Sequence, residues 1–445
     1  MLQPENSVLL REQLSEADLR EAWPVLSAND RAVSLMIVAR PVAEDIFSGL
    51  SSHDQSEVLL ALPAAERRSW MRSLPPDDAV DVIQEAPGDR REELLGLLDN
   101  GSRAEVKSLM AYREDVAGGL MNPRYTRMRA DMTVDEAVTY LRRQAREHPE
   151  TLSYVYVLDD QQRLKGVATF GQLFAAPPGT LVRDLMSTNV LSVTEQTDQE
   201  ALSKIFAQED VASIPVVDSE GHMKGIVTID DIVDVVQEEA TEDIQKLGGM
   251  EALDAPYFKT ALGLMIRKRA GWLIALFLGE MLTATAMAFF EGAISRAVVL
   301  ALFIPLIISS GGNSGSQATT LIIRSMALGE IRLRDWWRVA QRELVTGLAL
   351  GTVLGAIGFL RILAWQPFTH LYGEHYVLVA ATIFFSLIGV VTWGTMIGSL
   401  LPFVLRRLGF DPASASAPFV ATLVDVFGII IYFSVAAMIL MGSLA

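Results

Sequence analysis

Residues 412–441 read P-A-S-A-S-A-P-F-V-A-T-L-V-D-V-F-G-I-I-I-Y-F-S-V-A-A-M-I-L-M, and this stretch decides the class of fold. It is long enough to cross a bilayer, for which about 20 apolar residues suffice. One carboxylate, Asp425, stands near its middle, and the segment holds no Lys, Arg or His to pair with it. A charge at that depth is costly, so an ionisable residue there is by default a functional hypothesis. The alternative, a protonated or hydrogen-bonded Asp that helps helices to pack, stays open at this point.

The charge of the chain changes sign along its length. Up to Phe258 there are 46 acidic and 24 basic residues, a net charge of −22, and from Lys259 onward there are 8 and 13, a net charge of +5. The 445 residues are too many for one domain. We therefore expect an acidic soluble part followed by a membrane part. The acidic charge argues against nucleic acid as a partner, because nucleic acid needs a basic surface, and it favours cations.

Two absences narrow the class of protein further. The sequence contains no cysteine, which excludes disulfides and thiolate metal sites. The start, M-L-Q-P-E-N-S, lacks a basic region followed by an apolar run, so no cleavable signal peptide is expected. The acidic part is accordingly expected in the cytoplasm.

A period of twelve residues runs through residues 1–119, the first predicted domain. Turn-forming sequences such as S-S-H-D, P-A-A-E, P-P-D-D and D-N-G-S recur between apolar positions and are typical of capped helix starts. We expect a helix of one to two turns in each period, stacked into an α-helical solenoid, with a plain helical bundle as the alternative. The repeating apolar positions are Leu26, Val38, Leu50, Leu62, Leu74, Ala86 and Leu98, with a second series at Ile46, Val58, Trp70, Val82, Leu94 and Val106.

Residues 120–183 and 184–240 are predicted to be two copies of one module. The first contains L-M-N-P-R-Y-T and Y-V-Y-V-L-D-D, and the second contains L-M-S-T-N-V-L and I-P-V-V-D-S-E. Each copy predicts a short strand, a helix, a β-hairpin and a closing helix. This order resembles a tandem pair of CBS domains, an α+β regulatory module.

The CBS resemblance implies a nucleotide site, since many such pairs bind adenosine nucleotides between the copies. The usual ribose contact is the Asp that ends the motif G-h-x-[ST]-x-x-D. The second copy has it in G-I-V-T-I-D-D, with Thr228 and Asp231, whereas the first copy has Gln172 at the matching position. ATP at the second copy and a purely structural pair both stay open.

Residues 241–269 are predicted to connect the CBS pair to the membrane. In V-V-Q-E-E-A-T-E-D-I-Q-K-L-G-G, Glu239 stacks with Glu242 and Asp243 on one helical face, at spacings of three and four. Like charges so placed repel, and a hard divalent cation such as Mg2+ relieves the repulsion because it prefers carboxylate and water oxygens. A solvated surface is the alternative for a charge run. The two glycines are expected to end this helix, and a second helix is expected from Pro256.

Residues 270–445 predict a membrane domain of five helices. Ten basic residues lie at the ends that would face the cytoplasm, against two on the opposite side. This imbalance predicts a cytoplasmic N terminus and a C terminus on the other side of the membrane. The expected spans are 271–290, 297–325, 339–363, 377–405 and 412–441.

Polar residues inside the spans are concentrated in the second one. It reads I-P-L-I-I-S-S-G-G-N-S-G-S-Q, in which Pro305 and three glycines weaken the helix while Asn313 and Gln317 lie four apart on one face. Irregular backbone at this depth is tolerated where it is buried in protein or lines a water-filled cavity. We therefore expect a broken helix and a pore wall, with close helix packing through small residues as the alternative. Glu280 in the first span is a second intramembrane acid, whose direction the pattern leaves open.

No motif for nucleotide hydrolysis accompanies the spans. The sequence contains neither the phosphate-binding loop G-x-x-x-x-G-K-[ST] nor a histidine pair spaced to hold a catalytic metal. We therefore expect neither an enzyme nor an ATP-driven pump.

With G-G-N-S-G-S-Q, the CBS pair and A-P-F-V-A-T-L-V-D-V in one chain, the sequence resembles the MgtE family of magnesium channels or transporters over nearly its whole length. The resemblance implies a multi-domain protein of the bacterial inner membrane, with a helical N domain, a CBS pair, a plug helix in the connector and five spans. It also implies a homodimer with a pore on the two-fold axis. Two copies of Asp425 would then meet a largely hydrated Mg2+, beside a polar wall at Asn313.

The resemblance further implies cytosolic carboxylates that sense Mg2+. Bound ions would draw the acidic domains together and close the pore, and repulsion would open it when Mg2+ is scarce. Asp78 competes with Asp77 for the first position. Asp231 is a candidate for a nucleotide contact and for a metal ligand, and it stays open whether it has both roles or only one. The matching positions are Asp77, Asp81, Asp198, Glu200, Asp210, Asp231, Asp234, Glu239, Glu242, Asp243 and Asp411.

Two other functions stay open. A pore for another divalent cation, such as Co2+, would use the same carboxylates. A membrane-anchored sensor of Mg2+ or nucleotide that transports nothing would need neither Asp425 nor a polar second span. An anion pore is disfavoured, because the spans offer carboxylates where such a pore needs basic residues.

Overall fold

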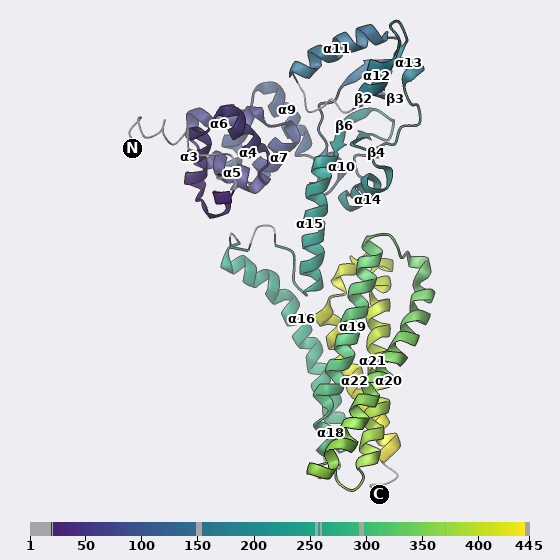
Figure 1. Cartoon of the computed structure of the whole chain (residues 1–445). Helices are drawn as coiled ribbons and strands as arrows, with labels where there is room; N and C mark the ends of the chain where they lie inside the picture. Colours follow the sequence, from purple (N-terminus) through teal and green to yellow (C-terminus); the bar gives the residue numbers. More distant parts are fainter. Residues whose placement is uncertain are drawn as a thin grey trace. The chain divides into compact units, whose positions relative to one another are not determined.

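We describe the chain from a computed structural model (Figure 1). The structure describes residues 19, 21–147, 154–253, 257–258, 260–292, 298–369 and 371–440. The chain divides into two compact units, Met1–Gln237 and Glu238–Ala445, and each is described by itself. Three predicted boundaries lie outside the described residues, namely Pro256, Ala297 and Met441.

The N domain of the first unit is a series of short helices with a regular repeat. Successive starts from α3 to α7 are spaced by twelve residues, as predicted, and α9 resumes the period after α8. Most of these helices have nine or ten residues, close to three turns, so they are longer than the predicted one to two turns. The bounds are η1 Trp23–Val25, α3 Ala28–Ile37, α4 Arg40–Ser48, α5 Ser52–Ala61, α6 Ala64–Ser73, α7 Pro76–Glu85, α8 Arg91–Leu97 and α9 Asn100–Leu109.

Side-chain caps begin only some of these helices. Ser51 caps α5 by accepting a hydrogen bond from the backbone N–H of Asp54, and Asp99 caps α9 in a similar way. Pro63 and Pro75 precede α6 and α7 without a side-chain cap. Pro76 is the first residue of α7, a position where proline is favoured because the N–H there has no intrahelical partner and the φ of proline is already fixed. The side chains before α6 and α7 therefore do not provide the caps expected in P-A-A-E and P-P-D-D, and in α7 a proline occupies the first helical position.

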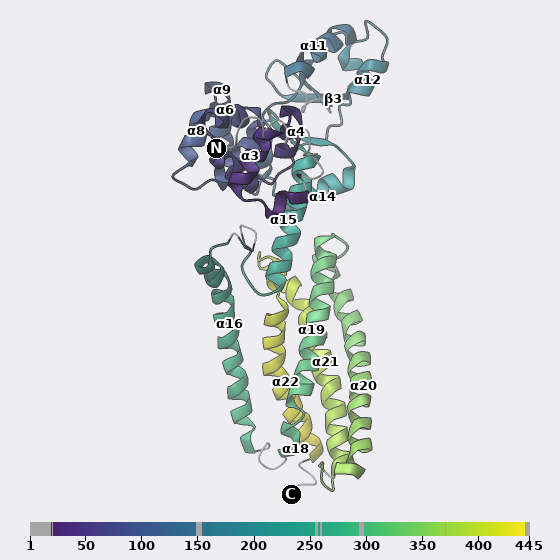
Figure 2. The ribbon, with the colours of Figure 1, turned by 60° about the vertical axis from the view of Figure 1, so that its left-hand side comes forward.

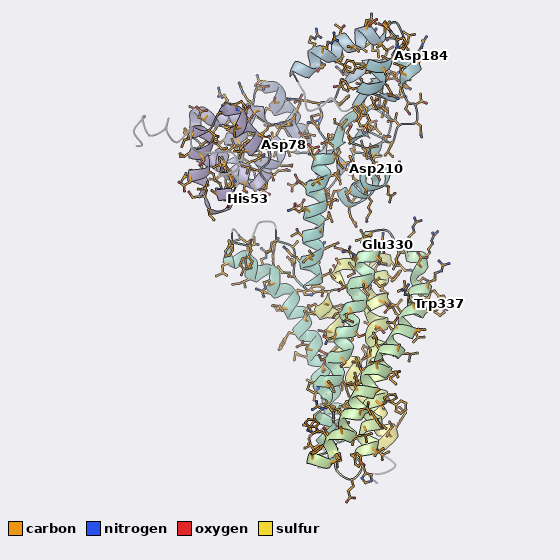
Figure 3. All side chains as sticks on the ribbon, in the orientation of Figure 1. His53, Asp78, Asp184, Asp210, Glu330 and Trp337 are labelled. Atoms are coloured by element: carbon orange, nitrogen blue, oxygen red, sulfur yellow. The ribbon has the colours of Figure 1, made fainter. Side chains whose placement is uncertain are left out.

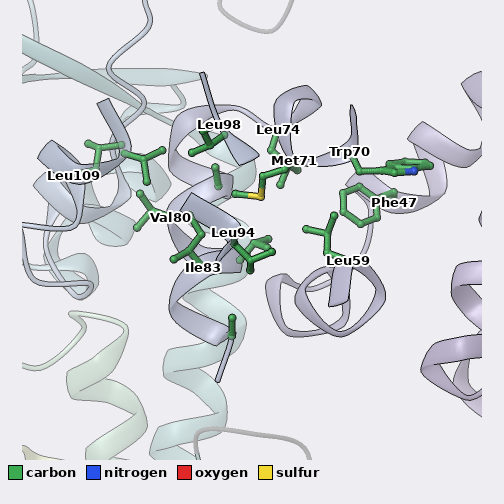
Figure 4. Packing of buried hydrophobic residues seen from close by; sticks show 14 of the residues in the cluster. Phe47, Leu59, Trp70, Met71, Leu74, Val80, Ile83, Leu94, Leu98 and Leu109 are labelled. Carbon is green, nitrogen blue, oxygen red and sulfur yellow. The ribbon is translucent and has the colours of Figure 1, made fainter. Parts of the chain in front are cut away.

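The second apolar series forms the core of the N domain. Trp70 contacts Phe47 with 4.9 Å between the ring centroids, and Leu59 and Met71 lie beside them (Figure 4). A buried residue from each successive helix builds one continuous core, as the repeat pattern requires. Each member of the series is at most 2% exposed: Ile46, Val58, Trp70, Val82, Leu94 and Val106.

Two copies of the predicted order of strand, helix, hairpin and helix follow the N domain. In each three-stranded sheet the first strand is parallel to the second, and the third is antiparallel to it. The first copy holds β1 Arg127–Arg129, α11 Val134–Glu147, β2 Tyr154–Leu158, β3 Leu164–Thr169 and α12 Phe170–Ala175. After α13 Val182–Leu185, the second copy holds β4 Val193–Thr194, α14 Gln199–Glu209, β5 Ser213–Val217, β6 Met223–Thr228 and α15 Ile229–Leu247.

The N domain packs on the second CBS copy. α10 (Ala117–Leu120) lies beside β4 and β6, and its first backbone N–H donates to the carbonyl oxygen of Thr197 at 2.7 Å. One apolar cluster runs from Leu109 of α9 to Phe206 of α14 and Ile232 of α15. The acidic residues of α7 and of the first turns of α15 meet at this contact.

α15 is one continuous helix of 19 residues. It closes the second CBS copy and also carries the acidic stretch of the predicted connector, so the predicted boundary between residues 240 and 241 falls within it. The helix ends before Gly248 and Gly249, as predicted, and Gly249 has a φ of +72°, which favours glycine. The domain boundaries themselves stay a prediction.

The second unit confirms the predicted five-helix membrane domain: among the described residues, five helices are long and apolar enough to cross a membrane. α21 is central and packs on α19, α20 and α22. α16 stands apart from the other four, packs on α22 and leaves nearly all of its apolar surface uncovered (Figure 2). The bounds are α16 Leu262–Phe289, α18 Val298–Ala301, α19 Ile304–Ala327, η3 Leu333–Asp335, α20 Trp336–Thr369, α21 Tyr376–Arg407, η4 Pro412–Ser414 and α22 Ala417–Leu440.

The second span is not broken at its glycines, and this part of the prediction was wrong. α19 is a regular helix throughout, and the break lies just before Pro305. A Cβ atom on Gly311 would stand 2.8 Å from the side chain of Val424, and one on Gly398 of α21 would stand 2.1 Å from the carbonyl oxygen of Gly315. The glycines therefore let α19 approach α21 and α22 closely, which is the packing alternative.

Candidate functional site

Asp425 lies in the middle of α22, and its side chain is half-buried. Within the part of the chain that the structure describes, it forms no hydrogen bond or ion pair. Glu280 of α16 is close enough to interact with it electrostatically. The two helices meet closely at this level, because a Cβ on Gly279 would stand 2.8 Å from the methyl carbon of Thr422. Two neighbouring acids in membrane helices favour an ion-accessible environment over contact with lipid.

Asn313 and Gln317 form a polar strip on α19, as predicted. Both side chains are exposed, whereas residues on the other faces of α19 pack into the helix bundle. The contact between Gly311 and Val424 places Asn313 within about one helical turn of Asp425 along the bundle. Exposed amides are unfavourable against lipid, so this face suits a water-filled pore or a second copy of the chain.

Five carboxylates form an acidic group where α7 meets α15: Asp77, Asp78, Asp230, Asp231 and Asp234 (Figure 3 labels Asp78). Burial, and then the charge of Asp231, raises the pKa of Asp77 well above its ordinary value. Burial, and then Asp230 and Asp234, raises the pKa of Asp78 to about 6. Burial also raises the pKa of Asp231 to about 7. The charge of Asp81 also raises the pKa of Asp77.

None of these five carboxylates forms an ion pair with a basic side chain of the described residues, and the pKa values within the group are raised by burial and by neighbouring acids. The Oδ1 atom of Asp77 is buried without a hydrogen-bond partner, and the whole residue is 7% exposed. A buried carboxylate oxygen with no partner suits a hard cation such as Mg2+. The described part of the chain nevertheless brings no three acidic or histidine side chains into one ligand sphere. Among the described residues the group is therefore a cluster of interacting charges and not a preformed ligand sphere.

Thr228 and Asp231, the predicted nucleotide contacts, engage one another at the start of α15. Asp231 Oδ2 accepts hydrogen bonds from the backbone N–H of Thr228 at 3.2 Å and from its hydroxyl at 2.6 Å. Thr169 and Gln172 form the matching capping box at the start of α12. The motif thus begins a helix in both copies, and a nucleotide role stays a prediction. A cavity of about 650 Å³ lies at the first copy between β1, α11 and the β2–β3 turn, and these two contacts do not line it.

Three predicted sensor residues of the second CBS copy have local roles at the two ends of α14. Asp198 caps the helix by accepting from the backbone N–H of Glu200 at 3.0 Å. Glu200 itself forms an ion pair with Lys204 at 2.6 Å. Asp210 ends the helix in the left-handed conformation, with a φ of +50°. α14 has 11 residues, so its two ends lie about 16 Å apart and a single chain does not bring these three carboxylates together.

The C-terminal end of α15 carries an ion-pair network that the sequence pattern does not predict. Lys246 Nζ lies 2.6 Å from Oδ2 of Asp411, just ahead of the fifth span, and Lys246 also pairs with Glu242. Burial lowers the pKa of Lys246, but the hydrogen bonds to both carboxylates outweigh burial and raise it. Glu239 and Asp243 are half-buried on the same helix. The spacing of Glu242 and Lys246 is visible in the sequence, but the contact with Asp411 is not.

Three family models match the chain. The MgtE intracellular N domain matches residues 14–115, and the CBS domain matches residues 182–238. The MgtE model, described as a divalent cation transporter, matches residues 304–435. The predicted fold class, with its N domain, CBS pair and five membrane helices, is confirmed by these matches together with the structure.

Two proteins of known name are similar to most of the chain, and a solved structure is similar to about half of it. "Magnesium transporter MgtE" of Thermus thermophilus is 40% identical over 99% of this chain and 97% of that protein. A protein of the same name from Enterococcus faecalis is 34% identical over 75% of this chain and 71% of its own length. The chain is also similar to a crystal structure of the cytosolic domain of the Mg2+ channel MgtE in complex with ATP. The two sequences are 39% identical, the match covers 51% of this chain and 92% of the chain in that structure, and the TM-score is 0.48. The chain belongs to the MgtE family of divalent cation transporters.

Proposed function

We propose that the chain is a Mg2+-selective channel or transporter, with an ion pathway at Asp425 and a gate that cytosolic Mg2+ closes. The position of Asp425 is the main observation that supports this proposal. This carboxylate stands in an apolar helix, has no basic partner among the described residues and lies about one turn from the exposed Asn313. Relatives that match along the chain are named magnesium transporters, and this supports Mg2+ as the substrate.

The ion pathway is proposed to form between two copies of the chain. Glu280, Asn313 and Gln317 are exposed on apolar helices of a single copy, and α16 is largely uncovered. A second copy on a two-fold axis would cover such faces and bring two Asp425 carboxylates to one ion. Mg2+ gives up its water reluctantly, so two carboxylates that meet a hydrated ion form a suitable selectivity device.

Closure is proposed to depend first on the acidic group between α7 and α15. When cytosolic Mg2+ is plentiful, the ion would neutralise Asp77, Asp78, Asp231 and Asp234 and hold the N domain on the second CBS copy. When it is scarce, repulsion would loosen that contact and favour the open gate. The unpartnered Oδ1 of Asp77 supports this role. The other proposed sensors are Asp81, Asp198, Glu200, Asp210, Glu239, Glu242, Asp243 and Asp411.

The proposed location is the bacterial inner membrane, with the N terminus in the cytoplasm and the C terminus outside. The distribution of basic residues between the ends of the spans supports this orientation. Another divalent cation such as Co2+ is the second candidate substrate, because oxygen ligands also bind other divalent metals and the matched family model names no single ion. Binding of ATP by Thr228 and Asp231 belongs to the same proposal as a modulator.

Growth rescue of a bacterium that lacks Mg2+ uptake tests the proposed function. The parent chain is expected to restore growth at low Mg2+, and Asp425→Ala is expected not to. Glu330→Gln is the matched control, because it neutralises an exposed carboxylate in the loop after α19 (Figure 3). Growth with Asp425→Ala equal to that of the parent, at equal amounts of protein in the membrane, would show that Asp425 is not in the pathway.

A further inference from the structure

Glu242 and Asp411 differ from the acidic group at α7 in one respect: they share a lysine. Lys246 Nζ lies 2.6 Å from Asp411 Oδ2, and the same ammonium pairs with Glu242 four residues earlier. The side chain of Lys246 is 27% exposed, so water only partly screens this network. An ammonium placed between two carboxylates offsets their repulsion through charge-assisted hydrogen bonds.

A Mg2+ ion would not be accommodated by this arrangement as it stands. The ion would need the carboxylate oxygens of Glu242 and Asp411 that Lys246 already engages. It would also have to bind within a few ångströms of another positive charge, which opposes binding. The two residues therefore do not fit a metal site while Lys246 lies between them.

The ion pair between Lys246 and Asp411 lies where the end of α15 packs against the membrane helices. Leu247 packs in an apolar cluster with Ala413 and Ala415, close to the start of α22. Trp272 of α16 donates through Nε1 to the hydroxyl of Ser416 at 3.1 Å. The contact of Lys246 with Asp411 thus adds a charged link to the apolar contact that Leu247 makes, while the hydrogen bond of Trp272 holds α16 on the start of α22.

From this geometry we infer that the ammonium group of Lys246, and not a bound Mg2+ ion, holds the end of α15 against the start of the fifth span. The inference rests on the proposed gating and refines it. Glu242 and Asp411 would act through Lys246, and Mg2+ dependence would arise at carboxylates that lack a cation, above all at Asp77 and its neighbours. The end of α15 would then stay attached to the membrane domain whether the gate is open or closed.

Hydrogen exchange followed by mass spectrometry on the full chain in detergent tests this inference. The readout is the exchange rate of peptides over residues 238–250, in EDTA and in millimolar Mg2+. The test variant is Lys246→Met, which keeps the length of the side chain and removes the charge. Lys246→Arg keeps the charge, and Lys204→Met removes a similar pair with Glu200 on α14.

The parent, Lys246→Arg and Lys204→Met are expected to exchange this segment at the same slow rate with and without Mg2+. Lys246→Met is expected to exchange it roughly tenfold faster in EDTA, because the link is lost, and to be slowed again by Mg2+, which can then occupy the two carboxylates. An unchanged rate for Lys246→Met in EDTA would overturn the inference, and so would a parent chain that needs Mg2+ for protection.

The same samples test the gating proposal separately. Peptides over α7 are expected to gain protection from Mg2+ in the parent and in all three variants. If α7 showed no response to Mg2+ while Lys246→Met behaved as expected, the gating proposal would fail and the role of Lys246 would stand.

Discussion

Asp77 of α7 and Asp231 of α15 repel one another across the contact between the N domain and the second CBS copy. Both are largely buried, and neither forms an ion pair with a basic residue among those described. A buried like-charge pair weakens the contact that contains it unless a proton or a cation neutralises it. The contact is therefore suited to respond to an added cation.

Asp77→Asn should strengthen this contact in the absence of Mg2+. The amide is similar in size but uncharged, so the variant is expected to gain about 1–3 kcal/mol in EDTA and to lose most of the stabilisation by Mg2+. Thermal unfolding of the full chain in detergent, with EDTA and with Mg2+, measures both effects. Asp89→Asn in an exposed turn of the N domain serves as the control. A variant less stable than the parent in EDTA would argue against repulsion at Asp77.

The stability of the first unit should depend on pH in EDTA. The pKa values of about 6 for Asp78 and about 7 for Asp231 exceed the ordinary value of 3.8, so the folded unit binds protons that the unfolded chain has already released. This contribution is fully present below about pH 4 and is lost as the pH rises through 6 and 7. Unfolding in EDTA is expected at a lower temperature at about pH 8 than at about pH 5.5, with a smaller difference for Asp231→Asn. A parent whose stability increased steadily over that range would contradict the assignment.

Protons and Mg2+ compete for the same carboxylates in this picture, so more Mg2+ should be needed for half-maximal stabilisation at about pH 5.5 than at about pH 8. An unchanged Mg2+ requirement would place the responsive site elsewhere.

Gly398→Ala should damage the membrane domain. Its Cβ would stand 2.1 Å from the carbonyl oxygen of Gly315, so α21 and α19 would have to separate. Overpacking of this kind typically costs about 1–3 kcal/mol. The fraction of monodisperse protein that survives heating in detergent measures the loss. Gly263→Ala, which adds the same methyl group to α16 in open space, should be close to neutral. Equal survival of both variants would show that the close approach is unimportant.

Local chemistry made much of the fold predictable from sequence. The twelve-residue period gave the helix starts of the N domain because each turn repeats a similar start signal, and Asp425 was identifiable because a lone carboxylate in an apolar segment is visible in sequence. The prediction of a break at the glycines of the second span was wrong. Low helix propensity suggested a break, but close packing on Val424 and Gly398 keeps α19 helical.

The contacts that matter most for the cytosolic carboxylates were not predictable in this way. Asp77 meets Asp231, and Lys246 meets Asp411, only because folding joins distant parts of the chain. Spacing along one helix groups Glu239, Glu242 and Asp243, but it does not show that Lys246 pairs with Glu242 and with the distant Asp411. Local periodicity shows which residues share a helix face, but the partner of that face is set by tertiary packing.

Mg2+ passage at Asp425 is tested most directly by flux into liposomes that contain the purified full chain and an enclosed Mg2+ indicator. Because the carboxylate is proposed to bind the passing ion, Asp425→Asn is expected to lower the initial rate of Mg2+ entry by at least about tenfold, the effect of a change near 1.4 kcal/mol. Glu330→Gln, with an equal amount of reconstituted protein, should match the parent. Mg2+ entry through Asp425→Asn at the parental rate would contradict the proposed pathway.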